Sequence, residues 1–380
     1  MKPNNKISFL KPKVPKLEEI ATDLNYVFDK AWLSNDGKFL REFEKEVSNY
    51  IGTDSLAVAN GTLGLILAEK ALELKGKVIV PSFTFSATAH SLVWNNLKPV
   101  FVDINKETYN ITSEEIEKAL EKNKNVSAIL AVHVFGNPCD IYSLEKLSKK
   151  YKLKLIFDSS HAFGAYYDNK SIGNFGDIEV FSTHATKMVM TGEGGIISSR
   201  NKDIISKIKQ LRNFGFSEED IGHQDTEICG TNAKMQEFSA ILGLWSIKQI
   251  NENIKNRELL AERYLKNLEG INGIFFQKTI PNTKRIYQFF SILIGKDFGL
   301  NRDNLAYRLE YDGIETKKYF YLPLHKNTYY KKDNNCVLSN TEFVSDNILC
   351  LPFYSHMTIE EVDIVCGSIK KIYNKCKTRK

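Results

Sequence analysis

Residues 181–195 read FSTHATKMVMTGEGG, and this stretch decides how the rest of the sequence is interpreted. An apolar segment, Ile178–Ser182, is typical of a buried strand, and small and polar residues follow it up to Lys187 and the glycine-rich turn Gly192–Gly195. The order G-x-x-x-x-G-K-[ST] is missing, so this is not a phosphate-binding Walker loop. A lysine held beside a buried sheet would have a lowered pKa and a nucleophilic amine. A solvated surface lysine is the alternative interpretation.

Apolar segments alternate with helical segments on both sides of this stretch. The predicted strands are residues 77–81, 99–104, 127–135, 153–158, 178–182 and 195–199. The predicted helices are residues 17–31, 61–74, 88–94 and 140–151, with one more that begins at the capping box Thr112-x-x-Glu115. Strands separated by helices, and strands that are apolar nearly throughout, favour βαβ units in a mostly parallel sheet. The fold class is therefore α/β.

The pattern changes near residue 245. A long helical stretch, 247–268, is followed by a strand at 289–294 and by looser segments rich in Asn and Tyr. We therefore expect a large domain over residues 1–245 and a smaller α+β domain over 246–380. The N-terminal segment could pack with the smaller domain instead of the large one.

The composition excludes several classes of protein. Of 380 residues, 42% are hydrophobic and 26% charged, as in ordinary globular proteins. The net charge of +6 is small, and only 9 of the 52 basic residues are arginine, the residue that nucleic-acid binders use for bidentate contacts. We expect no nucleic-acid partner.

The six cysteines form no C-x-x-C pair and none lies at ligand spacing from a histidine. We therefore expect no metal site and no disulfide framework. Scattered thiols fit a reducing compartment. Met1–Pro15 contains no apolar leader, and no apolar run reaches the ~18 residues of a membrane span. A cytoplasmic protein without membrane contact is expected.

Ligands of open α/β sheets bind outside the carboxyl ends of the strands, and four segments fall there. These are Asn60-Gly61-Thr62, Ser82–Phe85, Asp158–His161 and Ser182–Gly195. The first segment opens a helix, and the N-terminus of a helix offers free N–H groups to a phosphate. The hydroxyl of Ser182 could donate a further hydrogen bond to the same phosphate.

Two residues of these segments have competing interpretations. Asp158 is either a helix N-cap or a carboxylate that keeps the ring nitrogen of pyridoxal phosphate protonated, which makes the ring an electron sink. Phe85 either packs in the core or stacks on such a ring.

Seven segments, in order, resemble the DegT/DnrJ/StrS family of nucleotide-sugar aminotransferases. They are NGTLGL (60–65), PSFTFSATA (81–89), PVFVD (99–103), FDSSHAFGA (157–165), FSTHATKMVMTGEGG (181–195), RNFG (212–215) and GTNAKMQEFSAILGL (230–244). The resemblance covers residues 8–375. It implies a pyridoxal-phosphate-dependent enzyme of the aspartate-aminotransferase fold, fold type I.

The resemblance also implies a role for each matching residue. Lys187 binds the cofactor as a Schiff base and moves the proton, and Asp158 pairs with the pyridine nitrogen. The cofactor-binding set implied by the resemblance is Gly61, Thr62, Phe85, Asp158, His161, Ser182, Lys187 and Asn232. Asn232 of the partner subunit is expected to reach the phosphate, which implies a homodimer with shared active sites. A plain helix-start residue is the alternative interpretation of Asn232.

The implied reaction moves an amino group from L-glutamate to a keto-sugar on a nucleoside diphosphate. Some members carry histidine in place of the lysine and dehydrate their substrate; since Lys187 is present, we favour transamination. The segment HATK…TGEGG is closer to members that aminate C4 than to those that aminate C3. We therefore expect a dTDP-4-keto-6-deoxyhexose and a 4-amino-4,6-dideoxy product for a surface glycan such as lipopolysaccharide O-antigen.

Several alternatives stay open. They are amination at C3, a UDP- or GDP-linked sugar, and a non-catalytic ligand-binding or regulatory protein of the same fold. The sequence departs from the family pattern at Ser182-Thr183-His184 and at the Ser-Ser pair after Asp158, both of which fall near the expected cofactor.

Overall fold

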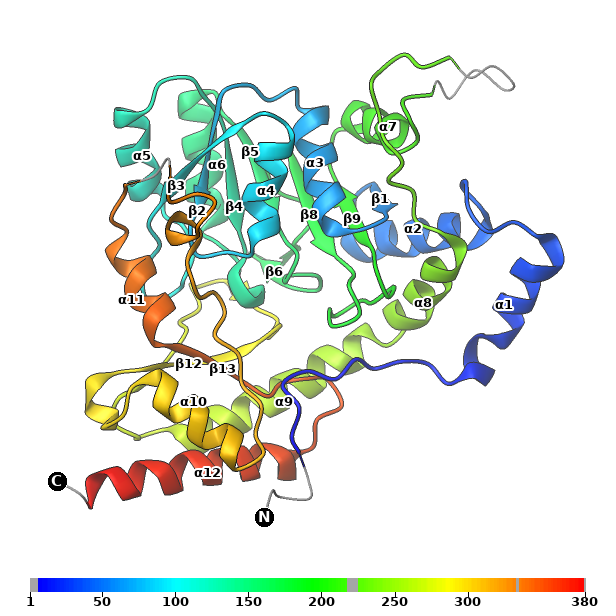
Figure 1. The fold of residues 1–380 in the computed structure, drawn as a ribbon. Helices are drawn as coiled ribbons and strands as arrows, with labels where there is room; N and C mark the ends of the chain where they lie inside the picture. Colours follow the sequence, from blue (N-terminus) through cyan, green and yellow to red (C-terminus); the bar gives the residue numbers. More distant parts are fainter. Residues whose placement is uncertain (1–5, 217–224, 333–334, 379–380) are drawn as a thin grey trace.

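A seven-stranded sheet forms the centre of the upper part of the molecule in Figure 1, in the order β1-β9-β8-β5-β4-β2-β3. The computed structural model describes residues 6–216, 225–332 and 335–378. The strands are β1 (Ser55–Val58), β2 (Lys77–Pro81), β3 (Lys98–Val102), β4 (Val126–Val132), β5 (Lys154–Asp158), β8 (Ile178–Ser182) and β9 (Gly195–Ser198). β9 pairs antiparallel with both its neighbours and the other ladders are parallel, which confirms a mostly parallel sheet.

Helices cover both faces of the sheet, because successive apolar side chains of each strand point to opposite faces. Val78 and Val80 of β2 belong to one apolar cluster and Ile79 to the other. The first face packs on α3 (Gly61–Ala71), α4 (Ser86–Trp94) and α7 (Lys202–Leu211). The second packs on α2 (Lys38–Ile51), α5 (Ser113–Lys122), α6 (Ile141–Tyr151) and α8 (Glu237–Ile247). α1 (Leu17–Lys30) contributes Val27 to this second face.

A second apolar core lies around a three-stranded sheet near the C-terminus. Its strands are β10 (Ile274–Phe276), β12 (Phe290–Ile294) and β13 (Ile348–Leu351), and its helices are α9 (Ile250–Leu268), α10 (Arg302–Tyr311) and α12 (Ile359–Lys377). α11 (Ser339–Asn347) contacts β12. A small sheet of β6 (Tyr166–Tyr167), β7 (Lys170–Ser171) and β11 (Thr283–Lys284) joins distant segments. In Figure 1 the α8–α9 run passes from the large sheet toward β12 and β13.

The N-terminal segment pairs with the C-terminal part of the chain. Ile7 forms a bridge with Ile314, and the Phe353 N–H donates to the Phe9 carbonyl at 3.1 Å. After these residues the chain crosses to α1, far from both termini in Figure 1. The domain division at residue 245 stays a prediction.

The structure departs from the expected elements in several places. The strand expected over 127–135 ends at Val132, because a 3₁₀ turn occupies Val134–Gly136. The helix expected over 247–268 begins at Ile250, since Lys248 and Gln249 separate α8 from α9. Helix α2 was not predicted, and neither were α7, α10, α11 and α12.

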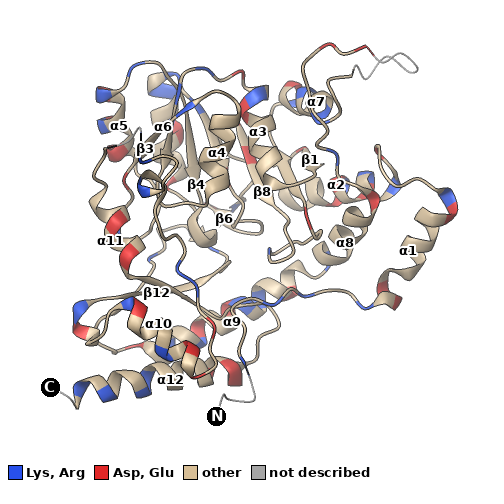
Figure 2. Ribbon diagram, in the orientation of Figure 1, with Lys and Arg blue, Asp and Glu red and all other residues tan. Residues whose placement is uncertain are grey.

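Charge is spread over many elements. Lys, Arg, Asp and Glu are interspersed along the helices in Figure 2. In α12, acidic residues occupy the first turn and basic residues the last, which suits the helix dipole. Within the described ranges, no helix has the length and apolar composition needed to cross a membrane, and no group of three His, Cys, Asp or Glu residues is placed to hold a metal ion.

Candidate active site

A cavity of about 350 Å³ lies where β5 and β8 end and α3 begins. Seven of the eight predicted site residues line it: Gly61, Thr62, Phe85, Asp158, His161, Ser182 and Lys187. Asn232 does not line this cavity; it is exposed and forms a bridge with Asn213. Residues from four separate parts of the large sheet are thus brought together.

The loop that carries Lys187 is held by its own backbone. The Thr183 N–H donates to the Gly194 carbonyl at 2.9 Å, and the Ala185 N–H to the Gly192 carbonyl at 2.8 Å. Burial lowers the pKa of Lys187 to about 8; the charge of Asp158 opposes this shift and that of Arg257 adds to it. A lysine with this pKa is about half neutral near pH 8, and the neutral amine is a nucleophile and a base.

Asp158 is the last residue of β5 and only 5% exposed. Thr88 Oγ1 donates to Asp158 Oδ2 at 2.7 Å, and the Ser160 N–H donates to Oδ1 at 3.1 Å. The chain continues from Asp158 through turns. The N-cap interpretation is therefore wrong, and the carboxylate lines the cavity.

The N-terminus of α3 meets the same cavity. Asn60 is its N-cap and accepts from the Leu63 N–H at 2.9 Å. The first N–H groups of a helix have no partner within the helix, so those of Gly61 and Thr62 are placed for an anion. A Cβ on Gly195 would lie 2.8 Å from the Asn60 carbonyl carbon and from the Gly61 nitrogen. This close approach places the start of α3 against the start of β9.

Two rings stand at the cavity. Phe85 precedes α4 and is 59% exposed, so the core interpretation of Phe85 is wrong. His161 is buried, and burial together with the charge of Lys187 keeps its pKa well below the usual value. The neutral imidazole packs edge-on to Phe289 and parallel to Phe320. Both rings can contact a flat ligand.

The sequence did not single out four other residues that line the cavity or act on its side chains. Thr88 holds Asp158, and Tyr319 and Phe320 line the cavity from the C-terminal part of the chain. Arg257 of α9 acts on Lys187 through its charge. The spacing of Thr84 and Thr88, one helical turn apart at the start of α4, was the one signal available.

These groups fit pyridoxal phosphate. The amine of Lys187 can bind an aldehyde, the buried carboxylate of Asp158 can pair with a pyridine nitrogen, and the start of α3 can hold a phosphate. Together with the mostly parallel sheet, they define a pyridoxal-phosphate-dependent transferase of fold type I. The chain belongs to the DegT/DnrJ/EryC1/StrS aminotransferase family, whose model matches residues 16–370.

The chain is similar over nearly its whole length to known sugar aminotransferases and related enzymes. A dTDP-4-amino-4,6-dideoxy-D-glucose transaminase of Shigella dysenteriae is 35% identical, covering 95% of this chain and 97% of the relative. A GDP-perosamine synthase of Vibrio cholerae is 31% identical, over 92% and 95%. The crystal structure of DesI with its TDP-sugar product has a TM-score of 0.90 and 31% identity, over 99% and 96%.

The protein is therefore a pyridoxal-phosphate-dependent sugar aminotransferase, and its substrate class is a nucleotide-linked sugar. The non-catalytic interpretation is not supported. The particular nucleotide and sugar are a separate question, since the similar proteins differ in both.

Proposed function

We propose that the enzyme transfers the amino group of L-glutamate to C4 of a dTDP-4-keto-6-deoxyhexose and releases a 4-amino-4,6-dideoxy sugar on dTDP. The observation that carries the reaction type is the placement of Lys187 and Asp158 at one cavity, with the N-terminus of α3 beside them. The expected use of the product is the assembly of a surface glycan such as O-antigen.

Each residue of the cavity has a part in this proposal. Pyridoxal phosphate supplies the electron sink for a carbanion. Lys187 would hold the cofactor through its amine and, once the amine of the donor has displaced it, would move a proton between the donor's α-carbon and the cofactor's C4′. Asp158 keeps the ring nitrogen protonated. The Gly61 and Thr62 N–H groups and the Ser182 hydroxyl would hold the phosphate of the cofactor, and His161 and Phe85 would contact its ring.

The choice of dTDP and C4 is supported by two observations. The dTDP-4-amino-4,6-dideoxy-D-glucose transaminase of Shigella dysenteriae is similar over almost its full length. The HATK…TGEGG pattern also favours C4 over C3. The GDP-perosamine synthase supports a GDP-linked sugar as the second candidate.

We further propose a homodimer in which Asn232 of the partner subunit completes the phosphate site. Asn232 is exposed, and so is Phe214 at 45%, whose neighbour Asn213 forms a bridge with Asn232. Exposed aromatic side chains are typical of surfaces that another chain covers. Light scattering that gives twice the chain mass supports the dimer, and Asn232→Ala should weaken cofactor binding without changing that mass.

A panel of nucleotide-linked sugars tests the substrate. The holoenzyme is incubated with L-glutamate and with the 4-keto and 3-keto 6-deoxyhexoses on dTDP, UDP and GDP, and the product is identified by NMR. We expect the dTDP-4-keto sugar to be converted with the highest kcat/KM and aminated at C4. A preference for GDP, or amination at C3, would replace the proposed substrate by the corresponding alternative.

A further inference from the structure

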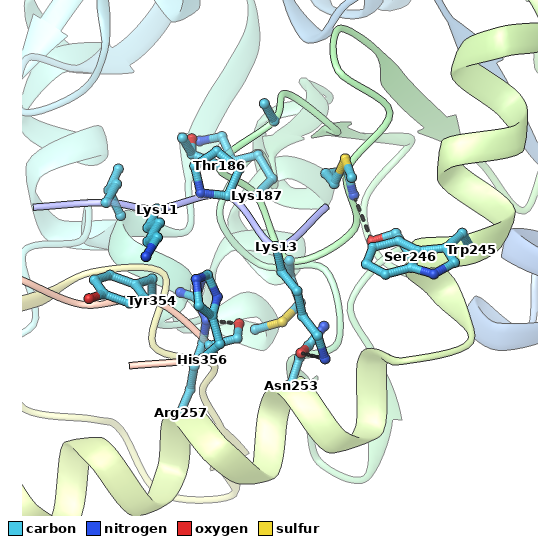
Figure 3. A pocket seen from close by; sticks show the side chains of 16 residues that line it. Lys11, Lys13, Thr186, Lys187, Trp245, Ser246, Asn253, Arg257, Tyr354 and His356 are labelled. Atoms are coloured by element: carbon cyan, nitrogen blue, oxygen red, sulfur yellow. Dashed lines mark hydrogen bonds between the residues drawn. The ribbon is translucent and has the colours of Figure 1, made fainter. Parts of the chain in front are cut away.

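A second, smaller crevice opens beside Lys187. It lies between residues 10–13, the Lys187 loop, α9 and residues 354–356, and it shares Leu10, Thr186 and Lys187 with the larger cavity. Figure 3 shows Lys11, Lys13, His356 and Arg257 gathered below Lys187. We call the set Lys11, Lys13, Arg257 and His356 the cationic crevice.

The described lining of this crevice is basic and contains no carboxylate. Three lysines and one arginine contribute charge, with one histidine among them. Like charges repel when they are gathered in a partly buried space, where the effective dielectric is low. Such a lining is stabilised when an anion occupies it.

Arg257 is the buried charge of the crevice, since it is only 4% exposed. Its Nε donates to Ser355 Oγ at 2.9 Å, and its Nη1 donates to the Tyr287 and Gln288 carbonyls at 2.7 and 3.0 Å. These partners are a hydroxyl and two carbonyls, and no ion pair of Arg257 with a carboxylate is seen among the described residues. Burial lowers the pKa of Arg257 to about 10, so the guanidinium stays protonated at neutral pH without a protein counter-ion.

The two lysines come from the segment that crosses in front of α9. Lys13 Nζ lies 3.4 Å from Asn253 Oδ1 and 3.8 Å from Glu252 Oε2, so its charge is partly offset. Lys11 is exposed, and its charge lowers the pKa of His356, after burial as the main cause. Lys11 is therefore the more available of the two for an incoming anion.

The size of the crevice limits what it can take. Its volume of about 20 Å³ is close to that of a single water site. A carboxylate oxygen fits such a space, whereas a nucleoside diphosphate or a hexose requires the larger cavity. Because Lys187 lines both spaces, a carboxylate in the crevice would hold an amino acid beside the Lys187 amine.

We propose that the cationic crevice binds a carboxylate of the amino donor, with Arg257 as the fixed charge and Lys11 as the side chain that closes on it. The proposal rests on the proposed function for the presence of an amino-acid donor. It assigns donor recognition to residues 10–13 and α9, apart from the cavity that takes the sugar nucleotide.

The test uses glutarate, a dicarboxylate without the amine, so that binding is seen without reaction. Trp245 lines the crevice and reports binding by fluorescence in a Trp32→Phe, Trp94→Phe holoenzyme. We expect glutarate to bind, and Lys11→Gln and Arg257→Lys each to weaken binding about 10-fold. Lys6→Gln is the matched control: Lys6 pairs with Glu315 at 3.6 Å outside the crevice, and its loss should change nothing.

The same variants are compared in the two half-reactions. The half-saturating concentration of L-glutamate should rise about 10-fold in Lys11→Gln and Arg257→Lys, while that of the keto-sugar stays unchanged. Lys11→Gln alone suffices if Arg257→Lys does not fold, because Lys11 is exposed.

Three results would overturn the proposal. They are the absence of glutarate binding to wild type, equal binding by Lys11→Gln and Lys6→Gln, and tighter binding of inorganic phosphate than of glutarate. Failure of the proposed function would look different, because no keto-sugar of the panel would be aminated while glutarate binding still followed the expected order.

Discussion

Thr88 donates a 2.7 Å hydrogen bond from Oγ1 to Oδ2 of Asp158, and Thr84 Oγ1 lies 2.8 Å from Thr88 Oγ1. The Ser160 N–H holds the other carboxylate oxygen. Each oxygen of Asp158 therefore has a fixed donor, and the plane of the carboxylate is set by the protein. Helix α4 thus orients the group that we propose faces the ring nitrogen of the cofactor.

The first prediction concerns this hydrogen bond. Thr88→Val keeps the side-chain shape and removes the donor. We expect the half-reaction with L-glutamate to slow by about 10- to 100-fold, since a hydrogen bond to a charged group contributes about 1.5–3 kcal/mol. Stopped-flow absorbance of the cofactor measures the rate. Thr88→Ser keeps the donor and should recover most of it; equally slow Ser and Val variants would show that packing is what matters.

The pKa of Lys187 gives a second prediction. Only the neutral amine attacks the aldehyde of pyridoxal phosphate, and burial lowers the pKa of Lys187 to about 8. The rate at which the apoprotein takes up the cofactor should therefore rise with pH through about 8, where half of the amine is neutral, and level off above it. Borohydride reduction followed by peptide mapping should place the cofactor on Lys187. A rate that kept rising to pH 10, as for an exposed lysine, would refute the lowered pKa.

Gly195 provides a third prediction. A methyl group there would press on the backbone of Asn60 and Gly61, which begins the helix proposed to hold the phosphate. We expect Gly195→Ala to weaken pyridoxal phosphate binding by about 5- to 100-fold, since overpacking costs about 1–3 kcal/mol. Gly367→Ala is the control, because nothing lies within 4 Å of a Cβ at that position. Cofactor affinity is measured by absorbance titration, and equal affinity in the two variants would contradict the assignment.

A fourth prediction concerns Glu69, which is buried between α3 and α4. It accepts hydrogen bonds from Ser91 Oγ and Asn95 Nδ2, and burial raises its pKa to about 8. Because the folded-state pKa lies above the unfolded one, the stability from this group is present at low pH and is lost as pH rises through 8. Glu69→Gln should therefore raise the free energy of unfolding at pH 9 by at least ~1 kcal/mol and much less at pH 5. Urea unfolding at both pH values measures this, and an equal effect at both would contradict it.

The sequence predicted the parts of the site that depend on local order. Lys187, Asp158 and the start of α3 each follow or precede a strand, so the rule that ligands bind at strand ends placed them together. Thr88 and Arg257 were missed because their contacts join distant segments: Thr88 and Asp158 are 70 residues apart in the chain. Packing decides such contacts. The spacing of Thr84 and Thr88 brings the two hydroxyls together, but it does not show that Thr88 reaches Asp158.

The fold, like the site, was predicted only in part. The alternation of strands and helices gave the mostly parallel sheet, but an apolar strand does not carry its direction, and the antiparallel β9 was not foreseen. Helix α2 was missed although Phe39, Phe43 and Val47 follow helical spacing, so its signal was available. The strand expected to reach Phe135 stops at Val132 because an apolar run continues into a buried turn.

The most direct test of the central claim follows one nitrogen atom. The holoenzyme is given ¹⁵N-labelled L-glutamate and dTDP-4-keto-6-deoxyglucose, and the product is examined by NMR. We predict ¹⁵N on C4 of the sugar with wild type and none with Lys187→Ala, in a variant that remains folded by circular dichroism. Label at another carbon, no label with wild type, or a labelled product from Lys187→Ala would contradict the account.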